Sequence, residues 1–504
     1  MSAVAHRPTK RHETVLADLP GLSLTESDPS GSVGVTGISL DSREVLPGDL
    51  YAALPGASVH GATFAAAAVQ AGAAAILTDP IGQDLTGDIP IPVVVVLNPR
   101  AVLGQVSAKI YDDPGASLTL IGVTGTNGKT TMTHLLAAAL SATGQKVGVM
   151  GTTGARIGEE ILPIARTTPE APDLHALLAL MKERGVTVVA MEVSSHALAL
   201  GRVDGLQFDS ATFMNLTQDH LDFHGSMAEY FDAKAALFTE ARADRAVIAT
   251  DDSWGRQLLA ATSIPVESFA VTHDADWTLA NPEHSTTGAW RGQAYGPRGI
   301  VVELTSRLPG QFNQSNALGA LATLVGLGHD PIAVAAGIAT CTGVRGRMEP
   351  VGSGPFAAFV DYAHTPEAVE RAIRAVREFC SGEILVAIGC GGDRDASKRP
   401  DMGRAAAANA DFVVVTDDNP RSESPAAIRS AVIAGVEAAA RAEVTEIGDR
   451  ASAIRELVTR ARLGDAVLVL GKGHETGQEI AGEMIPFDDR EVLEREIAAM
   501  EAAE

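Results

Sequence analysis

Cysteine is scarce in this chain of 504 residues, which contains only Cys341, Cys380 and Cys390. Three widely spaced cysteines form neither a disulfide framework nor a zinc-binding pattern. Long apolar runs are also missing, because the run at residues 91–97 is interrupted by Pro92 and is far shorter than a membrane span. The start of the chain, MSAVAHRPTKRH, lacks the apolar core of a signal peptide. We therefore expect a cytoplasmic protein with no membrane insertion.

Basic residues are outnumbered by acidic ones, 39 to 63, which gives a formal net charge of −24. Such an excess of negative charge repels nucleic acids and anionic membranes, so neither is an expected partner. An anionic ligand must then be held by local clusters of Arg and Lys. The hydrophobic content of 46% is that of an ordinary globular protein, and the length suggests about three domains.

A phosphate-binding loop is predicted within residues 118–131, LTLIGVTGTNGKTT. The apolar, β-rich run at 118–123 stops at a glycine-rich turn, and a helix-like segment follows at 132–140. Glycines let backbone N–H groups close around phosphate oxygens, and the helix N-terminus adds partial positive charge. Order and composition together indicate a strand, a phosphate loop and a helix.

Two side chains of this loop have expected roles in nucleotide binding. Lys129 is placed to reach the β- and γ-phosphates, and the Thr130 hydroxyl to bind Mg²⁺. The usual pattern has a glycine five residues before Gly128, where this chain has Val123, so the loop is the shorter T-G-T-N-G-K-T.

Two further polar segments follow apolar runs in the middle of the chain. Glu192 comes directly after the run at 186–191, where a carboxylate is a plausible Mg²⁺ partner. Residues 217–225, TQDHLDFHG, hold two histidines and two aspartates, and Lys234 lies on the next helix-like stretch. No cysteine joins them, so Mg²⁺ is favoured over zinc, while a metal role for His220 stays open.

Three domains are expected: residues 1–115, 116–345 and 346–504. Turn-forming DDPG at 112–115 and the glycine- and arginine-rich segment 343–350 mark the boundaries. Apolar strands alternate with helical segments throughout, which predicts an α/β fold with parallel sheets.

Less regular parts of the chain give weaker predictions. Residues 64–75 are alanine-rich and predict a helix, and residues 277–310 are typical of β-hairpins. The segment Phe312-Asn-Gln-Ser-Asn316-Ala-Leu is expected to open a helix that runs to about Leu327, and Asn316 would either cap that helix or bind a base.

In the last domain, three apolar strands each run into a polar, glycine-rich end. They are 384–388 followed by GCGGDRDASKRP, 412–415 followed by TDDNPRSE, and 466–470 followed by GKGHE. Ligands of open parallel sheets bind at the carboxyl ends of the strands. Three such ends rich in Arg, Asp and Glu favour a zwitterionic small molecule.

Eight motifs together cover essentially the whole chain: TGTNGKTT, MEVSSHAL, NLTQDHLDFHG, FNQSNALGA, VDYAHTP, GGDRD, DDNPR and GKGHE. In kind and order they resemble the Mur ligase family, in particular its members that add the third residue of the peptidoglycan stem to UDP-N-acetylmuramoyl-L-alanyl-D-glutamate. The resemblance implies an N-terminal UDP-binding domain, a central P-loop ATPase-like domain and a Rossmann-like C-terminal domain. It also implies ATP and Mg²⁺, and we expect a monomer.

The reaction implied by the resemblance has two steps. The side-chain carboxylate of D-glutamate attacks the γ-phosphate of ATP and forms an acyl phosphate. The amine of the incoming amino acid then attacks the acyl carbonyl and expels phosphate. Such a site must gather many negative oxygens and exclude water.

The resemblance assigns roles residue by residue. Glu192, His220 and Lys234 match metal-binding positions together with Thr130, and Lys234 matches a lysine that is carbamylated in the family, although the sequence alone favours a surface lysine. The implied ATP contacts are Gly125, Thr126, Asn127, Gly128, Lys129, Thr130, Thr131, Asn316, Arg347 and Asp361. The implied contacts to the UDP-muramoyl dipeptide are Leu40, Ser42, Thr167, Thr168, Ser194 and Arg202. Leu200 stands where some relatives have glutamine.

The implied amino-acid pocket consists of Arg394, Asp418, Asn419, Pro420, Arg421, Gly471 and Glu475. The DNPR form resembles enzymes that take meso-diaminopimelate, whose distal carboxylate suits an Arg and whose distal ammonium suits a Glu. L-lysine lacks that carboxylate and is the competing acceptor. Two competing functions for the whole chain are a ligase like folylpolyglutamate synthase and a non-catalytic P-loop nucleotide-binding regulator.

Overall fold

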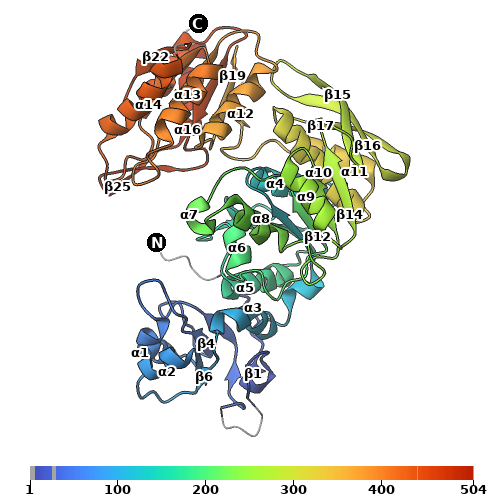
Figure 1. Ribbon diagram of the computed structural model, residues 1–504, viewed down its shortest axis with the longest axis vertical. Coiled ribbons are helices and arrows are strands. Elements are labelled where there is room, and N and C mark those ends of the chain that lie inside the picture. The colour runs from blue at the N-terminus through green and yellow to red at the C-terminus, as the bar shows by residue number, and fades with distance from the viewer. Residues whose placement is uncertain (1–5, 25–29, 353, 440, 503–504) are drawn as a thin grey trace. The chain divides into compact units, whose positions relative to one another are not determined.

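The computed structural model describes residues 6–24, 30–352, 354–439 and 441–502. The chain forms two compact units, coloured along the sequence in Figure 1. The first unit comprises Met1–Trp277 and Gly319–Gly337, and the second comprises Thr278–Leu318 and Ile338–Glu504.

The first unit begins with a small parallel sheet of order β3-β4-β5-β6. A two-stranded antiparallel ribbon of β1 (Thr14–Val15) and β2 (Gly34–Val35) precedes this sheet. The strands of the sheet and the helices around it are β3 (Gly37–Ser39), β4 (Asp49–Ala52), α1 (Ala65–Ala71), β5 (Ala75–Thr78), α2 (Pro80–Leu85), β6 (Val93–Val95) and α3 (Pro99–Ile110). The helix predicted at 64–75 is too long. It ends at Gly72, whose left-handed φ of 100° stops the helix, and Ala75 already starts a strand.

A larger sheet of order β10-β9-β8-β11-β7-β12-β13-β14 follows, parallel from β8 to β14. Its strands are β7 (Thr119–Thr124), β8 (Val147–Gly151), β9 (Gly154–Ile157), β10 (Glu160–Leu162), β11 (Val188–Glu192), β12 (Ser210–Phe213), β13 (Ala246–Ala249) and β14 (Val266–Ala270). The accompanying helices are α4 (Lys129–Ala142), α5 (Ala171–Glu183), α6 (Ser195–Ala199), α7 (Leu221–His224), α8 (Met227–Ala235) and α9 (Ser253–Ala261). The predicted strands at 118–123 and 186–191 are confirmed as β7 and β11, and β12 precedes the polar segment 217–225. Their central position in the sheet brings three polar strand ends to one edge.

The second unit opens with an antiparallel meander, which confirms the hairpin prediction. It consists of β15 (Trp277–His284), β16 (Trp290–Gly296) and β17 (Ile300–Ser306). The helices α10 (Gln311–Gly326) and α11 (Pro331–Ala339) follow in sequence, and their residues from Gly319 to Gly337 belong to the first unit. The helix predicted from Phe312 to about Leu327 is confirmed as α10. The alternative that Asn316 caps this helix is wrong, because Asn316 is a buried interior residue of α10, and its side-chain amide donates to Asn313 Oδ1 at 2.9 Å.

A six-stranded sheet of order β18-β19-β23-β20-β21-β22 forms the rest of the second unit, parallel except for β18. Its elements are β18 (Glu349–Pro350), β19 (Ala357–Asp361), α12 (Pro366–Arg377), β20 (Ile384–Ile388), α13 (Arg399–Asn409), β21 (Phe412–Val415), α14 (Pro425–Ala439), β22 (Glu443–Glu446), α15 (Arg450–Arg460), β23 (Ala466–Leu470) and α16 (Asp489–Glu501), with a hairpin of β24 (Gly477–Ile480) and β25 (Glu483–Pro486).

Both faces of this sheet are covered by helices, and α12, α13 and α14 on one of the faces are labelled in Figure 1. Alternate strand residues such as Val386 and Leu385 face opposite sides. Val386 packs with α12, α13 and α14, whereas Leu385 packs with α15 and α16. The strands β23, β20 and β21 are neighbours, so the three polar motifs that follow them meet at one edge.

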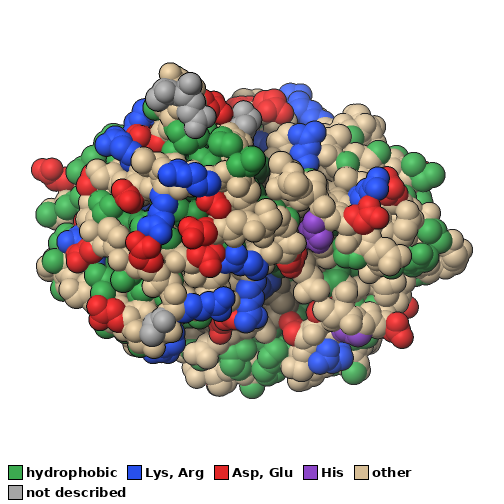
Figure 2. Space-filling view, turned by 90° about the horizontal axis from the view of Figure 1, so that it is seen from above, with side chains coloured by type: hydrophobic (Ala, Val, Ile, Leu, Met, Phe, Trp, Pro, Cys, Tyr) green, Lys and Arg blue, Asp and Glu red, His purple; other side chains and the backbone are tan. Residues whose placement is uncertain are grey.

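Acidic and basic side chains intermingle over much of the face shown in Figure 2. Among the residues that the structure describes, no helix is both long enough and apolar enough to cross a membrane.

Candidate functional site

The predicted phosphate loop connects the end of β7 to the start of α4. Gly125 and Gly128 have φ of 149° and 89°, which L side chains rarely adopt. Asn215 forms two hydrogen bonds with the loop. Its backbone carbonyl accepts from Thr126 N at 2.9 Å, and its side-chain Oδ1 accepts from Asn127 N at 2.9 Å. The Lys129 ammonium lies over the loop and donates to the carbonyls of Gly125, at 2.9 Å, and Thr126, at 2.8 Å.

Lys234 is buried against this loop, with 1% of its surface exposed. Its ammonium donates to Gly125 O at 2.9 Å and lies 4.8 Å from the centre of the Tyr230 ring. Burial, and then the positive charge of Lys129, lower the pKa of Lys234 well below its usual value, although Asp219 works in the other direction. The prediction of a surface lysine, which the sequence alone favours, is therefore wrong, and the surroundings of Lys234 favour its neutral form more than those of an exposed lysine do.

His220 lies near the same loop in a left-handed conformation, with φ of 54°. Its ring centre is 4.9 Å from that of His196 and 6.1 Å from that of Tyr230. Burial lowers the pKa of His220, and the charges of Lys129 and Lys234 lower it further, against the effect of Asp219. The imidazole is thus favoured in the neutral form that a metal ligand requires.

Glu192 is buried at the carboxyl end of β11, with 1% exposed. Its Oε1 accepts from the backbone N of Thr152 at 2.8 Å, and its Oε2 accepts from the Thr152 hydroxyl at 3.2 Å. Among the described residues, no three His, Cys, Asp or Glu side chains are arranged to hold a metal ion on their own. A magnesium site here therefore requires oxygens from another source as well.

Four of the residues predicted to contact the UDP-muramoyl dipeptide lie close to Glu192. The Thr168 hydroxyl donates to Glu192 O at 2.8 Å and accepts from Ser194 N at 3.1 Å. Arg202 donates to Thr168 O at 3.3 Å, and the Thr167 hydroxyl is 3.4 Å from that of Thr152. Leu200 ends α6 and brings no polar side chain.

A pocket of about 480 Å³ opens in the first unit. Leu40 lines it, and so do Asp41 and Arg43 on either side of Ser42; the predicted Ser42 is not among the lining residues.

Three arginines surround the carboxylate of Glu170, which lines this pocket. Its oxygens lie 2.9 Å from Arg202 Nε, 3.2 Å from Arg100 Nη1 and 4.0 Å from Arg166 Nε. These three guanidinium groups outnumber the one carboxylate of Glu170 and can bind an anionic ligand such as a diphosphate, while Asp41, Glu44 and Asp173 line the same pocket. The sequence-based reasoning missed Glu170, although it directly follows Thr167-Thr168-Pro169.

The remaining predicted ATP residues, Asn316, Arg347 and Asp361, belong to the second unit. Asp361 ends β19, and its carboxylate accepts from Met348 N at 2.6 Å. Burial raises the pKa of Asp361, while the charge of Arg347 opposes that rise. The Arg347 guanidinium lies 4.9 Å from the centre of the Tyr362 ring.

The residues predicted for the amino-acid pocket come together at the edge formed by β20, β21 and β23. Asn419 donates to Glu475 Oε2 at 2.7 Å, across the loops that follow β21 and β23. Gly471 leaves room for the carboxylate of Asp418, because a Cβ on Gly471 would lie 2.5 Å from Asp418 Oδ2. A Cβ on Gly392 would likewise lie 1.9 Å from Pro420 O.

Arg421 joins the loop after β21 to the β24–β25 hairpin. Its backbone has a left-handed φ of 51°, and its N–H donates to Glu479 O at 2.9 Å. Its guanidinium donates to Gly392 O at 2.7 Å and lies 3.3 Å from Glu479 Oε2. The side chains of Arg421 and Arg394 both lie beside Gly391. A Cβ on that glycine would be 3.0 Å from Arg421 Nη1 and 3.8 Å from Arg394 Cγ.

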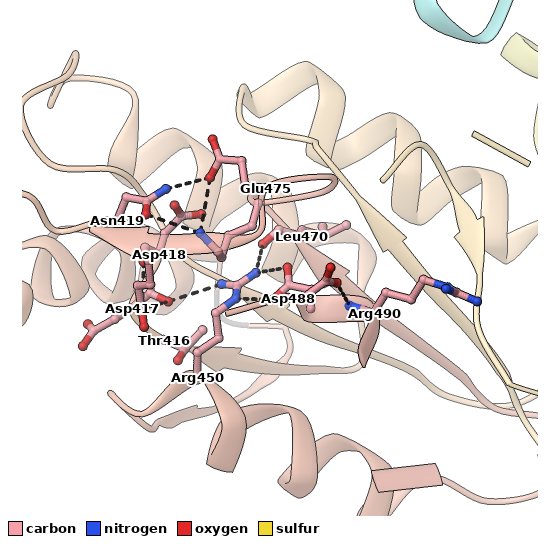
Figure 3. Close-up of polar contacts among 12 residues, drawn as sticks. Thr416, Asp417, Asp418, Asn419, Arg450, Leu470, Glu475, Asp488 and Arg490 are labelled. Carbon is pink, nitrogen blue, oxygen red and sulfur yellow. Dashed lines mark hydrogen bonds and ion pairs between the residues drawn. The ribbon is translucent and has the colours of Figure 1, made fainter. Parts of the chain in front are cut away.

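Lys472 is a further part of this pocket that the sequence-based reasoning missed. It is completely buried, and it donates to Gly477 O at 2.6 Å, with Asn419 Oδ1 and Glu475 Oε2 each at 3.3 Å. Figure 3 shows Asn419, Asp418 and Glu475 gathered above Arg450. The signal for Lys472 was its place inside GKGHE.

Comparison with protein families gives three matches along the chain. Residues 34–111 match the Mur ligase family catalytic domain, residues 123–324 the Mur ligase middle domain, and residues 346–473 the Mur ligase glutamate ligase domain.

Individual relatives match over nearly their whole length. The UDP-N-acetylmuramoyl-L-alanyl-D-glutamate--2,6-diaminopimelate ligase of Streptomyces coelicolor is 48% identical over 497 residues, 97% of this chain and 98% of that protein. The ligase of the same name from Corynebacterium glutamicum is 47% identical over 92% of this chain and 91% of its own. A solved structure of a ligase of this name has a TM-score of 0.72 and 31% identity, covering 97% of this chain and all of that one.

Proposed function

The chain belongs to the Mur ligase family, and from that premise we propose that it is an ATP-dependent ligase that adds meso-2,6-diaminopimelate to the D-glutamate of UDP-N-acetylmuramoyl-L-alanyl-D-glutamate. The support is the similarity to diaminopimelate ligases over 97% of the chain, together with the charged pocket of the second unit. The domain boundaries at residues 115 and 345, and a place in cytoplasmic peptidoglycan precursor synthesis, are part of the same proposal.

Activation of the glutamyl carboxylate is assigned to the phosphate-loop region. The γ-carboxylate oxygen attacks the γ-phosphorus of ATP, the bond to the β–γ bridging oxygen breaks, and ADP leaves. Lys129 and the loop N–H groups stabilise the negative charge on the transferred phosphoryl group. Thr168, Ser194 and Arg202 orient the acyl substrate, since they are joined to one another at the end of β11.

A magnesium ion would be held by Thr130, Glu192, His220 and a carbamylated Lys234, together with phosphate oxygens of the nucleotide. The burial and lowered pKa of Lys234 suit this role, because only the neutral form of an amine adds CO₂ to give an anionic carbamate. Bound Mg²⁺ supplies charge neutralisation at the phosphate oxygens.

Amide formation is assigned to the second unit, which binds the incoming amino acid. Its amine attacks the acyl carbonyl, phosphate leaves with the electron pair of the broken C–O bond, and the amine loses a proton. The observation that carries the choice of diaminopimelate is the pairing of opposite charges at one sheet edge. Arg421 and Arg394 suit a carboxylate, while Glu475 and Asp418 suit an ammonium group.

Phosphate release with purified protein, ATP, Mg²⁺ and UDP-N-acetylmuramoyl-L-alanyl-D-glutamate tests the proposal. Diaminopimelate, L-lysine and a folate with glutamate are supplied in turn, and the product is identified by its mass. We expect release and a tripeptide product with diaminopimelate. Release with lysine alone overturns the choice of acceptor, release only with folate and glutamate overturns the substrate class, and no release with any acceptor overturns the activity.

A further inference from the structure

A buried ion pair lies beneath the two loops that carry the amino-acid pocket. Arg450 is the first residue of α15 and Asp489 the first of α16, and the side chains of both are completely inaccessible to solvent. Arg450 Nε donates to Asp489 Oδ1 at 2.6 Å, and Nη2 donates to Oδ2 at 2.7 Å. This two-pronged geometry balances the two charges in the interior of the second unit.

The same guanidinium also donates to two backbone carbonyls, as Figure 3 shows. Nη2 of Arg450 donates to Leu470 O at 2.9 Å, and Nη1 donates to Asp417 O at 3.3 Å. Leu470 is the last residue of β23 and directly precedes Gly471, while Asp417 directly precedes Asp418. One side chain therefore ties together the starts of the two loops.

The spacing of these loops decides how the pocket residues meet. Asn419 on one loop donates to Glu475 on the other at 2.7 Å. Gly471 leaves no room for a side chain beside Asp418. A shift of a few tenths of an ångström between the two carbonyls held by Arg450 would be passed on to these pairs.

We infer that Arg450 is a positioning residue for the amino-acid pocket, which sets the distance between the two loops without touching the substrate. This inference rests on the proposed function. Burial lowers the pKa of Arg450, but the charge and hydrogen bonds of Asp489 outweigh it, so the guanidinium stays charged. A lysine at this position would keep the charge, yet its single ammonium lacks the planar fork that reaches a carboxylate and two carbonyls at once.

The chain offers a matched control for a purely structural role. Arg455 Nε lies 2.9 Å from Glu496 Oε2, so this pair joins the same helices, α15 and α16. Among the described residues, no hydrogen bond joins Arg455 to either loop.

The test compares Arg450→Lys with Arg455→Lys in the full chain, by phosphate release with diaminopimelate, ATP and the UDP substrate varied separately. We expect Arg450→Lys to raise the KM for diaminopimelate at least tenfold and to leave the other two KM values within twofold. Arg455→Lys should leave all three within twofold. An equal rise in all three KM values, or a lower melting temperature with an unchanged KM for diaminopimelate, overturns the inference.

If Arg450→Lys fails to fold, Asp489→Asn is tested in its place, because this variant keeps the guanidinium of Arg450 but weakens its ion pair with residue 489. The same selective rise in the KM for diaminopimelate is expected, and an unchanged value overturns the inference. The wild-type chain separates the two proposals. If it uses a different amino acid, the proposed acceptor is wrong and the comparison is made with the acceptor found. If it releases no phosphate with any acceptor, both proposals fall.

Discussion

The ammonium groups of Lys129 and Lys234 both donate to the carbonyl oxygen of Gly125, each at 2.9 Å. Two like charges on one acceptor repel each other, which lowers the pKa of the more buried group. Lys234 is that group, and its pKa is lowered well below the usual value by burial and by Lys129. The contact thus favours the neutral amine that the proposed carbamylation of Lys234 requires.

Lys234→Ala should reduce the rate of phosphate release by roughly 100-fold or more, because an oxygen ligand would be lost from a charge-stabilising site. Short carboxylic acids such as formate or acetate should restore part of the rate by supplying the missing oxygens. The measurement is the rate of phosphate release with and without added acid. Carbamylation itself is checked by ¹³C NMR of wild-type protein in ¹³C-bicarbonate.

Lys109→Ala, which removes an exposed lysine on α3, is the control and should behave like wild type. Unchanged turnover in Lys234→Ala, or equal stimulation of both variants by formate, would contradict a metal-linked role for Lys234.

Arg202 links two parts of the region assigned to the UDP substrate. It donates to Thr168 O and pairs with Glu170. Arg202→Lys keeps one charge but loses the fork, so the KM for the UDP substrate should rise about tenfold while that for ATP stays within twofold. Arg242→Lys is the control, since Arg242 pairs with Asp204 in the same unit. Equal rises in both KM values would place Arg202 outside the UDP site.

Strands and loops of this fold could be predicted from the sequence because their signal is local. The run at 384–388 is apolar at every position and is bounded by Glu383 and by a glycine-rich segment that begins at Gly389, and the structure has β20 over the same residues. Likewise, the glycines of the phosphate loop and Lys129 appear in the order that the motif requires. Helix ends were harder, since the helix predicted at 64–75 ends at Ala71 and Ala75 already starts β5.

Burial and distant contacts could not be predicted in the same way. Lys234 lies on an alanine-rich stretch that is typical of a surface helix, and only tertiary packing places it under the phosphate loop. Arg450 contacts Asp417, Leu470 and Asp489, which are between 20 and 39 residues away in sequence. The sequence alone does not reveal these contacts, so it gives no reason to single out Arg450 among the arginines.

His175 makes a specific prediction about stability. It is completely buried on α5, where its Nε2 lies 3.1 Å from Asp204 O, and burial lowers its pKa to about 4. Between pH 6.5 and about 4 the unfolded chain therefore binds more protons at this site than the folded chain. The free energy of unfolding should fall with falling pH in that window, by up to about 1.4 kcal/mol per pH unit from this group.

Urea unfolding of wild type and His175→Gln at pH 7 and pH 5 checks this. The loss of stability between the two pH values should be smaller in the variant by about 1–2 kcal/mol. Asp173, whose pKa burial raises to about 6, has the opposite pH dependence, so only the difference between the two proteins is interpreted. His12→Gln, at an exposed histidine, should match wild type. An equal loss in all three proteins would contradict the assignment.

Arg421 should decide between diaminopimelate and lysine as acceptors. Its guanidinium is held by Gly392 O and Glu479, and its backbone pairs with the β24–β25 hairpin, so it is fixed before a substrate arrives. A charge-assisted hydrogen bond to the distal carboxylate contributes about 2 kcal/mol, so Arg421→Ala should raise the KM for diaminopimelate roughly 30-fold. The KM for ATP should stay within twofold. The preference for diaminopimelate over lysine should fall roughly 30-fold as well, because lysine has no distal carboxylate and therefore loses no contact with Arg421. Arg404→Ala, which removes an exposed arginine on α13, should change neither value; a variant at Arg421 that kept its preference would show that another side chain recognises the distal carboxylate.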